Sequence, residues 1–258
     1  MTAQQDGNPN LKVLPGGLPE GASPIPWLSV VIPIYNEEGI LASSVISLRE
    51  NLKELGKTFE ILLAENGSVD RTLELCEELK TRYPEVDYFS VGEPNYGKAL
   101  KEGILRARGS YVVCDEIDLG DMDFYRRALD RLVNGDAAMV VGSKVLVGAE
   151  DTRPVFRRVA TVVYNTMLRT VLHFHGTDTH GMKAFHRDTL VGTAGRCVVD
   201  RDVFASEFVI RAERERYPVV EIPVRVVEKR KPSINLIKRV PNVVRNLSYL
   251  TYVMRVLE

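Results

Sequence analysis

The chain has 258 residues, of which 45% are hydrophobic and 27% are charged, and its formal net charge is -1. This composition predicts a globular protein with a sizeable core, and the balanced charge gives no reason to expect nucleic acid as a partner. The three cysteines, Cys76, Cys114 and Cys197, lie too far apart for a zinc motif or a disulfide framework, which fits a reducing cytoplasm.

Residues 1–26 are rich in Pro and Gly and lack an apolar run of signal-peptide length, so we expect a flexible arm without a secretion signal. Strands follow at 28–33, 59–64, 88–91 and 111–113, and a helical pattern comes after each of the first three. This alternation predicts an α/β fold with a Rossmann-like, mostly parallel sheet and helices on both faces. Ligands of such sheets bind outside the carboxyl ends of the strands.

The alternation loosens in the second half of the chain. The expected elements there are helices at about 123–133, 157–172 and 202–216, strands at 137–141 and 219–224, and a polar segment at 177–181. We expect one catalytic domain over residues 27–235, whose first half binds a nucleotide and whose second half shapes the other substrate.

Glu116 and Asp118 stand two residues apart, directly after the strand expected at 111–113. Carboxylates with this spacing at a strand end can converge on one hard cation, and that cation can neutralise a nucleotide diphosphate. A solvated acidic turn would have the same sequence. The preceding strands, each followed by a polar turn and a helix, favour the cation site.

Two further polar turns lie at the ends of predicted strands. The segment Pro33–Glu37 can hold a flat base or ribose, and Asn66 can both donate to and accept from a base edge. The same residues would also suit plain turns, and Ser68 and Asp70 are good helix caps. Lys98, near the start of the next helix, is a candidate phosphate contact, although exposed lysines are commonly just solvated.

In order and spacing, four motifs resemble those of family 2 glycosyltransferases with the GT-A fold. These motifs are Pro33–Glu37, Glu65–Asp70, Gly97–Ala99 and Glu116–Leu119. The second half resembles the polyprenyl-phosphate hexosyltransferases, which include the dolichyl-phosphate mannose and glucose synthases. The positions that carry this second likeness are Gly142–Lys144, Arg158, Asn165, Asp178–Phe185, Glu207 and Glu221–Val224.

The resemblance implies a donor pocket. The residues implied around the nucleoside and its base are Pro33, Tyr35, Glu37, Glu65 and Asn66, with Lys98 near the donor. Glu116 and Asp118 would bind Mg or Mn, which bridges the diphosphate oxygens. His180 could also reach the metal or the diphosphate.

An acceptor pocket is implied as well, with Lys183 against the acceptor phosphate and Ser143, Lys144 and Arg158 in the same region. A phosphate acceptor is already an anion, so it needs positioning more than deprotonation. If the acceptor were a sugar hydroxyl, Asp178 or Glu207 would be the candidate base. Otherwise these two residues would be a helix cap and a surface charge.

The chain departs from the family pattern at several of these positions. Glu65 and Asn66 replace paired aspartates, and Glu116 replaces an aspartate, with Asp115 as an alternative ligand if the strand ends earlier. The segment Gly181–Lys183 replaces Gly-Phe-Arg. Charge and hydrogen-bonding capacity are kept, so we expect an active enzyme.

Residues 236–258 are expected to form a basic, amphipathic C-terminal helix. Seven Lys or Arg and one acid lie between Arg225 and Arg245, and apolar residues repeat at helical spacing from Leu236 to Leu257. Such a helix can lie in a bilayer interface and attract anionic lipids. It can equally pack on its own core or on a second subunit in a homodimer.

These observations predict a metal-dependent, inverting enzyme that moves a hexose from a nucleotide-diphosphate sugar to a polyprenyl or dolichyl phosphate. GDP-mannose and UDP-glucose are both candidate donors. We expect a cytoplasmic protein that is peripheral at the inner face of the membrane. The alternatives are a family 2 enzyme that acts on a soluble or polysaccharide hydroxyl, and a non-catalytic nucleotide-sugar-binding or membrane-adaptor protein.

Overall fold

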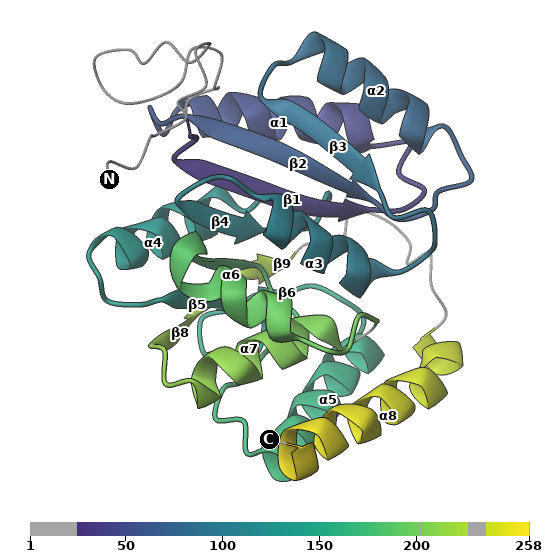
Figure 1. Ribbon diagram of the computed structural model, residues 1–258, viewed down its shortest axis with the longest axis vertical. Helices are drawn as coiled ribbons and strands as arrows, with labels where there is room; N and C mark the ends of the chain where they lie inside the picture. The colour runs from purple at the N-terminus through teal and green to yellow at the C-terminus, as the bar shows by residue number, and fades with distance from the viewer. Residues whose placement is uncertain (1–24, 202, 227–235, 258) are drawn as a thin grey trace, which may run out of the picture.

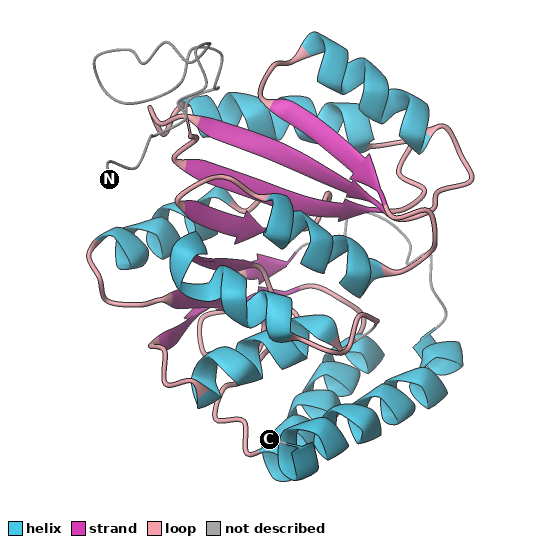
Figure 2. Ribbon diagram, in the orientation of Figure 1, coloured by secondary structure: helices cyan, strands magenta, loops and turns pink. Residues whose placement is uncertain are grey.

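The computed structural model describes residues 25–201, 203–226 and 236–257, and of these the side chains of 236–243, 256 and 257 are left out. The expected arm therefore lies almost wholly outside the described residues. Figures 1 and 2 show helices packed around a twisted sheet. Its strands are β1 (Leu28–Ile34), β2 (Phe59–Glu65), β3 (Val86–Ser90), β4 (Tyr111–Cys114), β5 (Met139–Ser143), β7 (Lys183–His186) and β8 (Val219–Pro223).

The seven strands are ordered β3-β2-β1-β4-β7-β5-β8. Every neighbouring pair is parallel except those made by β7, which runs antiparallel to β4 and to β5. The predicted α/β fold with a mostly parallel sheet is confirmed. A separate two-stranded sheet joins β6 (Glu150–Asp151) to β9 (Arg225–Val226).

Helices cover both faces of the sheet because side chains alternate along each strand. Val30 and Ile32 of β1 point into one core, whereas Val31 between them points into another. The first core is closed by α1 (Leu41–Lys53), α2 (Thr72–Arg82) and α4 (Met122–Val133). The second is closed by α3 (Tyr96–Arg106), α5 (Val155–Leu172), α6 (Arg187–Arg196), α7 (Phe204–Arg214) and α8 (Leu236–Tyr252).

Strand β7 and the helix α6 that follows it were not expected from the sequence. Strand β7 is only four residues long and mixes Lys183 and His186 with two apolar residues, so it lacks a clear strand pattern. Its place between β4 and β5 depends on pairing with residues about 70 and 45 positions away in the chain. Local sequence carries no signal for such pairing.

Helix α8 packs on the protein's own core over its described C-terminal half. Leu247 and Leu250 of α8 are buried with residues of α5 and α7, as is Met254 of the π-helical turn η1 (Val253–Leu257) that continues it. Arg214 of α7 donates to the carbonyls of Met254 and Leu172, which ties the ends of α8 and α5 together. The amphipathic character expected for the whole helix stays a prediction, because its first half lies outside the described side chains. Within the described chain, no helix is long and apolar enough to cross a bilayer.

Candidate active site

The loops after β1 and β2 are locked together at the carboxyl edge of the sheet. The Asn36 amide donates to Ser68 Oγ at 2.9 Å, and the Val69 amide donates to Asn36 Oδ1 at the same distance. The Glu37 amide donates to Thr72 Oγ1 at 2.7 Å. Asn36 has a φ of 55°, a left-handed conformation that asparagine tolerates better than most residues. These hydrogen bonds join the two polar turns predicted from sequence into one surface, which we call the ledge.

The sequence suggested that the first strand ends at Pro33, but β1 continues by one residue to Ile34. β4 pairs with β1 only as far as Cys114 opposite Val31. Beyond that point the edge of β1 that faced β4 is unpaired, and the Pro33 nitrogen lies along it. The missing N–H of proline therefore costs no ladder hydrogen bond.

Glu65 and Asn66, expected against the base, make internal hydrogen bonds. Glu65 accepts from the Ser68 amide at 2.5 Å and from the Ser90 hydroxyl. Burial alone would raise the Glu65 pKa, but these hydrogen bonds lower it overall. Asn66 Nδ2 donates to the Ile34 carbonyl at 2.9 Å. Glu65 shapes the turn that a base would approach, and a direct base contact stays a prediction.

Glu116 and Asp118 follow β4 at the same edge of the sheet, and both side chains are half-buried. Both interact electrostatically with Tyr96, in the first turn of α3. Among the described residues, no three His, Cys, Asp or Glu side chains are grouped to hold a metal ion. The pair fits a divalent cation that takes its remaining oxygen ligands from a bound diphosphate.

Asp115 cannot replace Glu116 as a ligand, so that alternative from the sequence is wrong. Its side chain is 2% exposed and accepts a hydrogen bond from the Tyr125 hydroxyl at 2.7 Å. Burial raises the Asp115 pKa to about 7. The carboxylate belongs to the core under α4.

Lys98 lies in the first turn of α3, and its ammonium pairs with Glu93 at 2.8 Å on the surface. Its backbone amide donates to the side chain of Asn95, which caps α3. Exposed pairs of this kind contribute little free energy, so a phosphate could displace Glu93. The phosphate contact of Lys98 stays a prediction.

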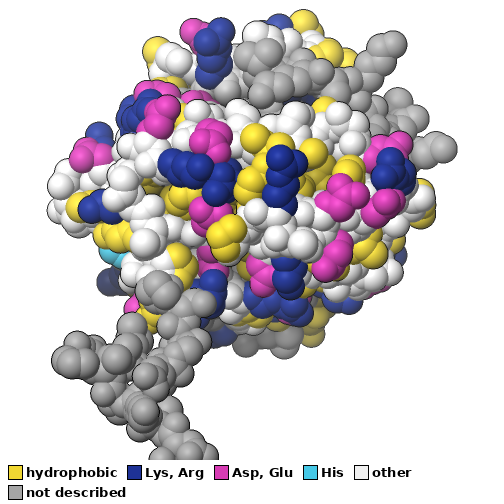
Figure 3. Space-filling model, turned by 90° about the horizontal axis from the view of Figure 1, so that it is seen from above, with side chains coloured by type: hydrophobic (Ala, Val, Ile, Leu, Met, Phe, Trp, Pro, Cys, Tyr) yellow, Lys and Arg dark blue, Asp and Glu magenta, His cyan; other side chains and the backbone are white. Residues whose placement is uncertain are grey.

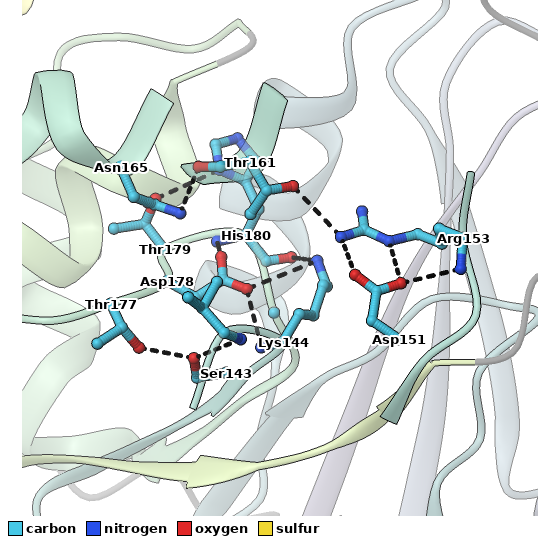
Figure 4. A network of polar contacts seen from close by, with 12 residues as sticks. Ser143, Lys144, Asp151, Arg153, Thr161, Asn165, Thr177, Asp178, Thr179 and His180 are labelled. Atoms are coloured by element: carbon cyan, nitrogen blue, oxygen red, sulfur yellow. Dashed lines mark hydrogen bonds and ion pairs between the residues drawn. The ribbon is translucent and has the colours of Figure 1, made fainter. Parts of the chain in front are cut away.

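A second group of polar side chains surrounds Asp178, in the loop between α5 and β7 (Figure 4). The fully buried Asp178 carboxylate accepts from the backbone amides of Lys144 at 3.2 Å and His180 at 2.9 Å. The Lys144 ammonium lies 3.9 Å from it. Burial alone would raise the Asp178 pKa, but Lys144 and the amides lower it overall. Asp178 is no helix cap, and the lowered pKa makes it a weak base.

Ser143 ends β5 and Lys144 follows it. Their place in an acceptor pocket, which the family resemblance implied, stays a prediction. The Ser143 hydroxyl shares a hydrogen bond of 2.7 Å with Thr177 Oγ1. The Lys144 ammonium donates to the His180 carbonyl at 3.3 Å. These contacts fold the loop over 177–180 back onto the strand end.

Lys183 begins β7 and joins this group from the centre of the sheet. Its side chain is 2% exposed, and Nζ donates to the Gly181 carbonyl at 2.8 Å. Burial lowers the Lys183 pKa to about 8, although Asp178 and Glu116 oppose the shift. The antiparallel strand thereby places a buried cation within electrostatic range of Glu116.

Arg153, rather than Arg158, is the arginine of this group. The Arg153 guanidinium holds Asp151 through two hydrogen bonds of 2.9 and 2.7 Å and contacts Thr161 at 3.3 Å. It also interacts electrostatically with Asp178 and Glu116. Arg158 is exposed on α5. Sequence reasoning missed Arg153, although its position just before the proline-initiated helix was a usable signal.

His180 lies beside α5. Its ring meets the Tyr164 ring edge-on at 5.0 Å between centroids. The Tyr164 hydroxyl and the Thr179 hydroxyl both bond to Ser206 of α7, at 2.9 and 2.8 Å. The Asn165 amide nitrogen bonds to the Thr161 carbonyl at 3.0 Å, while its buried oxygen has no partner among the described residues.

Glu221 of β8 braces the loop that carries Asp178. One carboxylate oxygen accepts from the amides of Thr177 at 2.6 Å and Asp178 at 3.0 Å, and the other accepts from the Thr177 hydroxyl at 2.7 Å. A Cβ on Gly176 would lie 2.3 Å from the Phe174 ring and 2.6 Å from this carboxylate, so a larger residue there would have to displace them. Glu221 was part of the sequence likeness, but no role was predicted for it.

Glu207 is not a surface charge, and its carboxylate does not join the Asp178 group. It is fully buried on α7 and accepts from the amides of Val198 and Val199. Arg211 pairs with it at 2.7 Å. Both carboxylate oxygens of Glu207 hold the 197–199 loop, so neither is placed to take a proton from a substrate.

Comparison with known proteins agrees with this geometry. The family model described as "Glycosyl transferase family 2" matches residues 29–204. The chain is 28% identical over 216 residues to glycosyltransferase AglD of Haloferax volcanii, covering 82% of this chain and 35% of that protein. It is 30% identical to dolichyl-phosphate beta-glucosyltransferase ALG5D of Trichomonas vaginalis, covering 77% of this chain and 65% of the relative. The chain thus spans about a third of the length of the first relative and about two thirds of the length of the second.

A further relative, dolichyl-phosphate beta-glucosyltransferase of Dictyostelium discoideum, is 26% identical, covering 88% of this chain and 76% of its own. Among solved structures, glucosyl-3-phosphoglycerate synthase of Mycobacterium tuberculosis, in complex with Mn2+ and UDP, superposes with a TM-score of 0.62 at 19% identity. That likeness covers 88% of this chain and 80% of the other, and it establishes the GT-A fold. By its fold and its match over residues 29–204, the chain is a member of glycosyl transferase family 2.

Proposed function

We propose that the protein is an inverting glycosyltransferase that moves a hexose from a nucleotide-diphosphate sugar to a polyprenyl phosphate at a membrane surface. One observation carries the acceptor assignment. Lys144, Lys183 and Arg153 gather around the buried Asp178, and two of them are within electrostatic range of Glu116. Arg153 is paired with Asp151, whereas the Lys183 ammonium donates to a neutral group, the Gly181 carbonyl, so Lys183 is the cation best placed to bind an incoming phosphate.

The donor would lie along the ledge made by the β1 and β2 loops, with its diphosphate toward Glu116 and Asp118. A Mg or Mn ion held by these two residues would neutralise charge on the diphosphate leaving group. The rigid ledge would hold the nucleoside still, so that the anomeric carbon faces the cationic group. Of the relatives, the mycobacterial synthase is described with Mn2+ and UDP.

A phosphate acceptor needs no strong base, and this agrees with the groups present. Asp178 has a lowered pKa and accepts two backbone hydrogen bonds, so it is poorly suited to take a proton from a sugar hydroxyl. Lys144, Lys183 and Arg153 would instead orient the anionic oxygen for attack on the face opposite the leaving group, which inverts the anomeric centre. Two relatives named as dolichyl-phosphate glucosyltransferases support this acceptor class.

The same cations would also suit a small phosphorylated acceptor, and one solved neighbour is a glucosyl-3-phosphoglycerate synthase. The test is a turnover screen with GDP-mannose and UDP-glucose as donors. Each donor is offered with a short-chain polyprenyl phosphate, with 3-phosphoglycerate, and with no acceptor, in the presence of Mg or Mn and again with chelator. Lipid-linked sugar as the main product supports the proposal. Turnover of 3-phosphoglycerate alone contradicts it.

A further inference from the structure

Helix α5 carries a continuous apolar stripe on its exposed side. Five of its large side chains are between 44% and 63% exposed, and they are Val155, Phe156, Val159, Val162 and Val163. Their spacing of one, three and four residues places them on one face of the helix. We call this set the α5 stripe. Exposed apolar residues are ordinary when scattered, but a contiguous row indicates a binding surface.

The surroundings of the α5 stripe are basic. Helix α5 contains no Asp or Glu, and its Arg158 and Arg169 are exposed. Helix α8, which lies beside α5 in Figure 1, has no acidic residue either, and its Arg245 is exposed. By contrast, acidic and basic side chains are interspersed over the face seen in Figure 3. An apolar stripe flanked by these arginines is complementary to an anionic lipid surface.

The opposite side of the same helix forms a wall of the candidate acceptor pocket. Thr161 contacts Arg153, Tyr164 packs on His180, and Asn165 is buried beside them (Figure 4). The width of one helix, about 10–12 Å, therefore separates the α5 stripe from the cationic group.

We propose that the α5 stripe is the surface by which the protein docks on an anionic bilayer, with α5 lying in the plane of the interface. This proposal rests on the proposed function, because docking would serve to present the acceptor pocket to a lipid-borne phosphate. It replaces the C-terminal apolar repeat as the lipid-facing element, because Leu247, Leu250 and Met254 of that repeat are buried in the core.

The experiment is sedimentation of the full chain with vesicles. Phosphatidylcholine vesicles are compared with vesicles that also contain phosphatidylglycerol, at low and high salt. The variant Phe156→Ser/Val159→Ser removes the centre of the stripe, and Leu73→Ser/Val133→Ser is the control, since Leu73 and Val133 are 44% and 55% exposed on other helices. We expect binding to the anionic vesicles that salt weakens, a loss on the order of tenfold in the stripe variant, and none in the control.

Equal binding by the stripe variant and the wild type, or no binding by the wild type at low salt, would overturn the proposal. Light scattering tests whether a second copy of the chain covers the stripe instead. If the wild type is a dimer and the stripe variant is a monomer, the stripe is a subunit contact. Turnover measurements separate the docking proposal from the proposed enzymatic function. The stripe variant should keep its rate on a water-soluble short-chain polyprenyl phosphate and lose it on a vesicle-borne acceptor. If no polyprenyl phosphate is turned over while vesicle binding still depends on the stripe, the function fails and the docking surface stands.

Discussion

The carboxylate of Glu221 accepts a hydrogen bond of 3.0 Å from the backbone amide of Asp178, and so strand β8 fixes the loop on which the proposed acceptor pocket is built. The same carboxylate holds the amide and hydroxyl of Thr177. Asp178 in turn accepts from the amides of Lys144 and His180. The position of the pocket's cations therefore depends on a residue that need not touch a substrate.

We expect Glu221→Gln to weaken acceptor use more than donor use. Glutamine keeps the size of the side chain but loses the charge and turns one acceptor into a donor. A charge-assisted hydrogen bond lost from a partly buried site costs about 1.5–3 kcal/mol, which is about ten- to a hundredfold in acceptor kcat/KM. The exposed Glu54→Gln is the control. An unchanged acceptor KM in Glu221→Gln would show that the loop holds its shape without the brace.

Asp118→Asn should reduce metal-dependent transfer by about a hundredfold or more, because it removes a ligand charge at the carboxyl edge of the sheet. The melting temperature should stay near that of the wild type, since the side chain is only half-buried. Asp123→Asn, a change of the same chemistry at an exposed position nearby, is the control. Calorimetric titration of Mn in the presence of nucleoside diphosphate measures the site directly. Undiminished Mn affinity in Asp118→Asn would contradict the assignment of Asp118 as a metal ligand.

Lys183 should impose an alkaline limit on acceptor use. Burial lowers its pKa to about 8, so the ammonium is charged below that pH and is lost as pH rises through it. Acceptor kcat/KM should then fall towards tenfold per pH unit above about 8, since this parameter reports the free enzyme. Lys183→Arg should move the limit to higher pH. A profile that is flat up to pH 10 in the wild type would contradict a phosphate contact by this lysine.

Lys183→Ala should slow lipid transfer about ten- to a hundredfold at neutral pH, while donor hydrolysis by water changes little. The two rates are measured on one preparation at equal donor saturation, with the exposed Lys80→Ala as the control. If hydrolysis falls as far as transfer, Lys183 belongs to the donor side. If neither rate falls, its buried charge has only a structural role.

Leu250→Ala should lower the free energy of unfolding by about 2–5 kcal/mol, because the side chain is fully buried between α8 and the core. Tyr249→Ala, one residue earlier and 52% exposed, should cost much less. Urea denaturation followed by circular dichroism measures both. Equal small losses would mean that the described half of α8 is held too loosely to count as core.

The sequence by itself determined which edge of the sheet carries the site that we propose for the donor. Each early strand ends in a polar turn, and parallel strands bring their carboxyl ends to one edge, so the Asn36, Asn66 and Glu116 turns had to be neighbours. The apolar repeat Leu41, Val45, Leu48 and Leu52 likewise coincides with the buried face of α1, because a sheet offers a covering helix one apolar side. For these elements, local pattern and global fold agree.

Only the tertiary structure decided the acceptor side. Its residues come from β5, the loop after β6, α5, the loop before β7 and β8, and β7 itself inserts antiparallel between distant strands. Spacing along the chain cannot say whether Arg153 or Arg158 points inward, or that Glu207 is buried with Arg211. Nor could it tell that the apolar repeat of α8 faces the core while the apolar stripe of α5 faces outward. An apolar row on a helix is the same signal in both places, and only the neighbours that pack on it determine which row stays exposed.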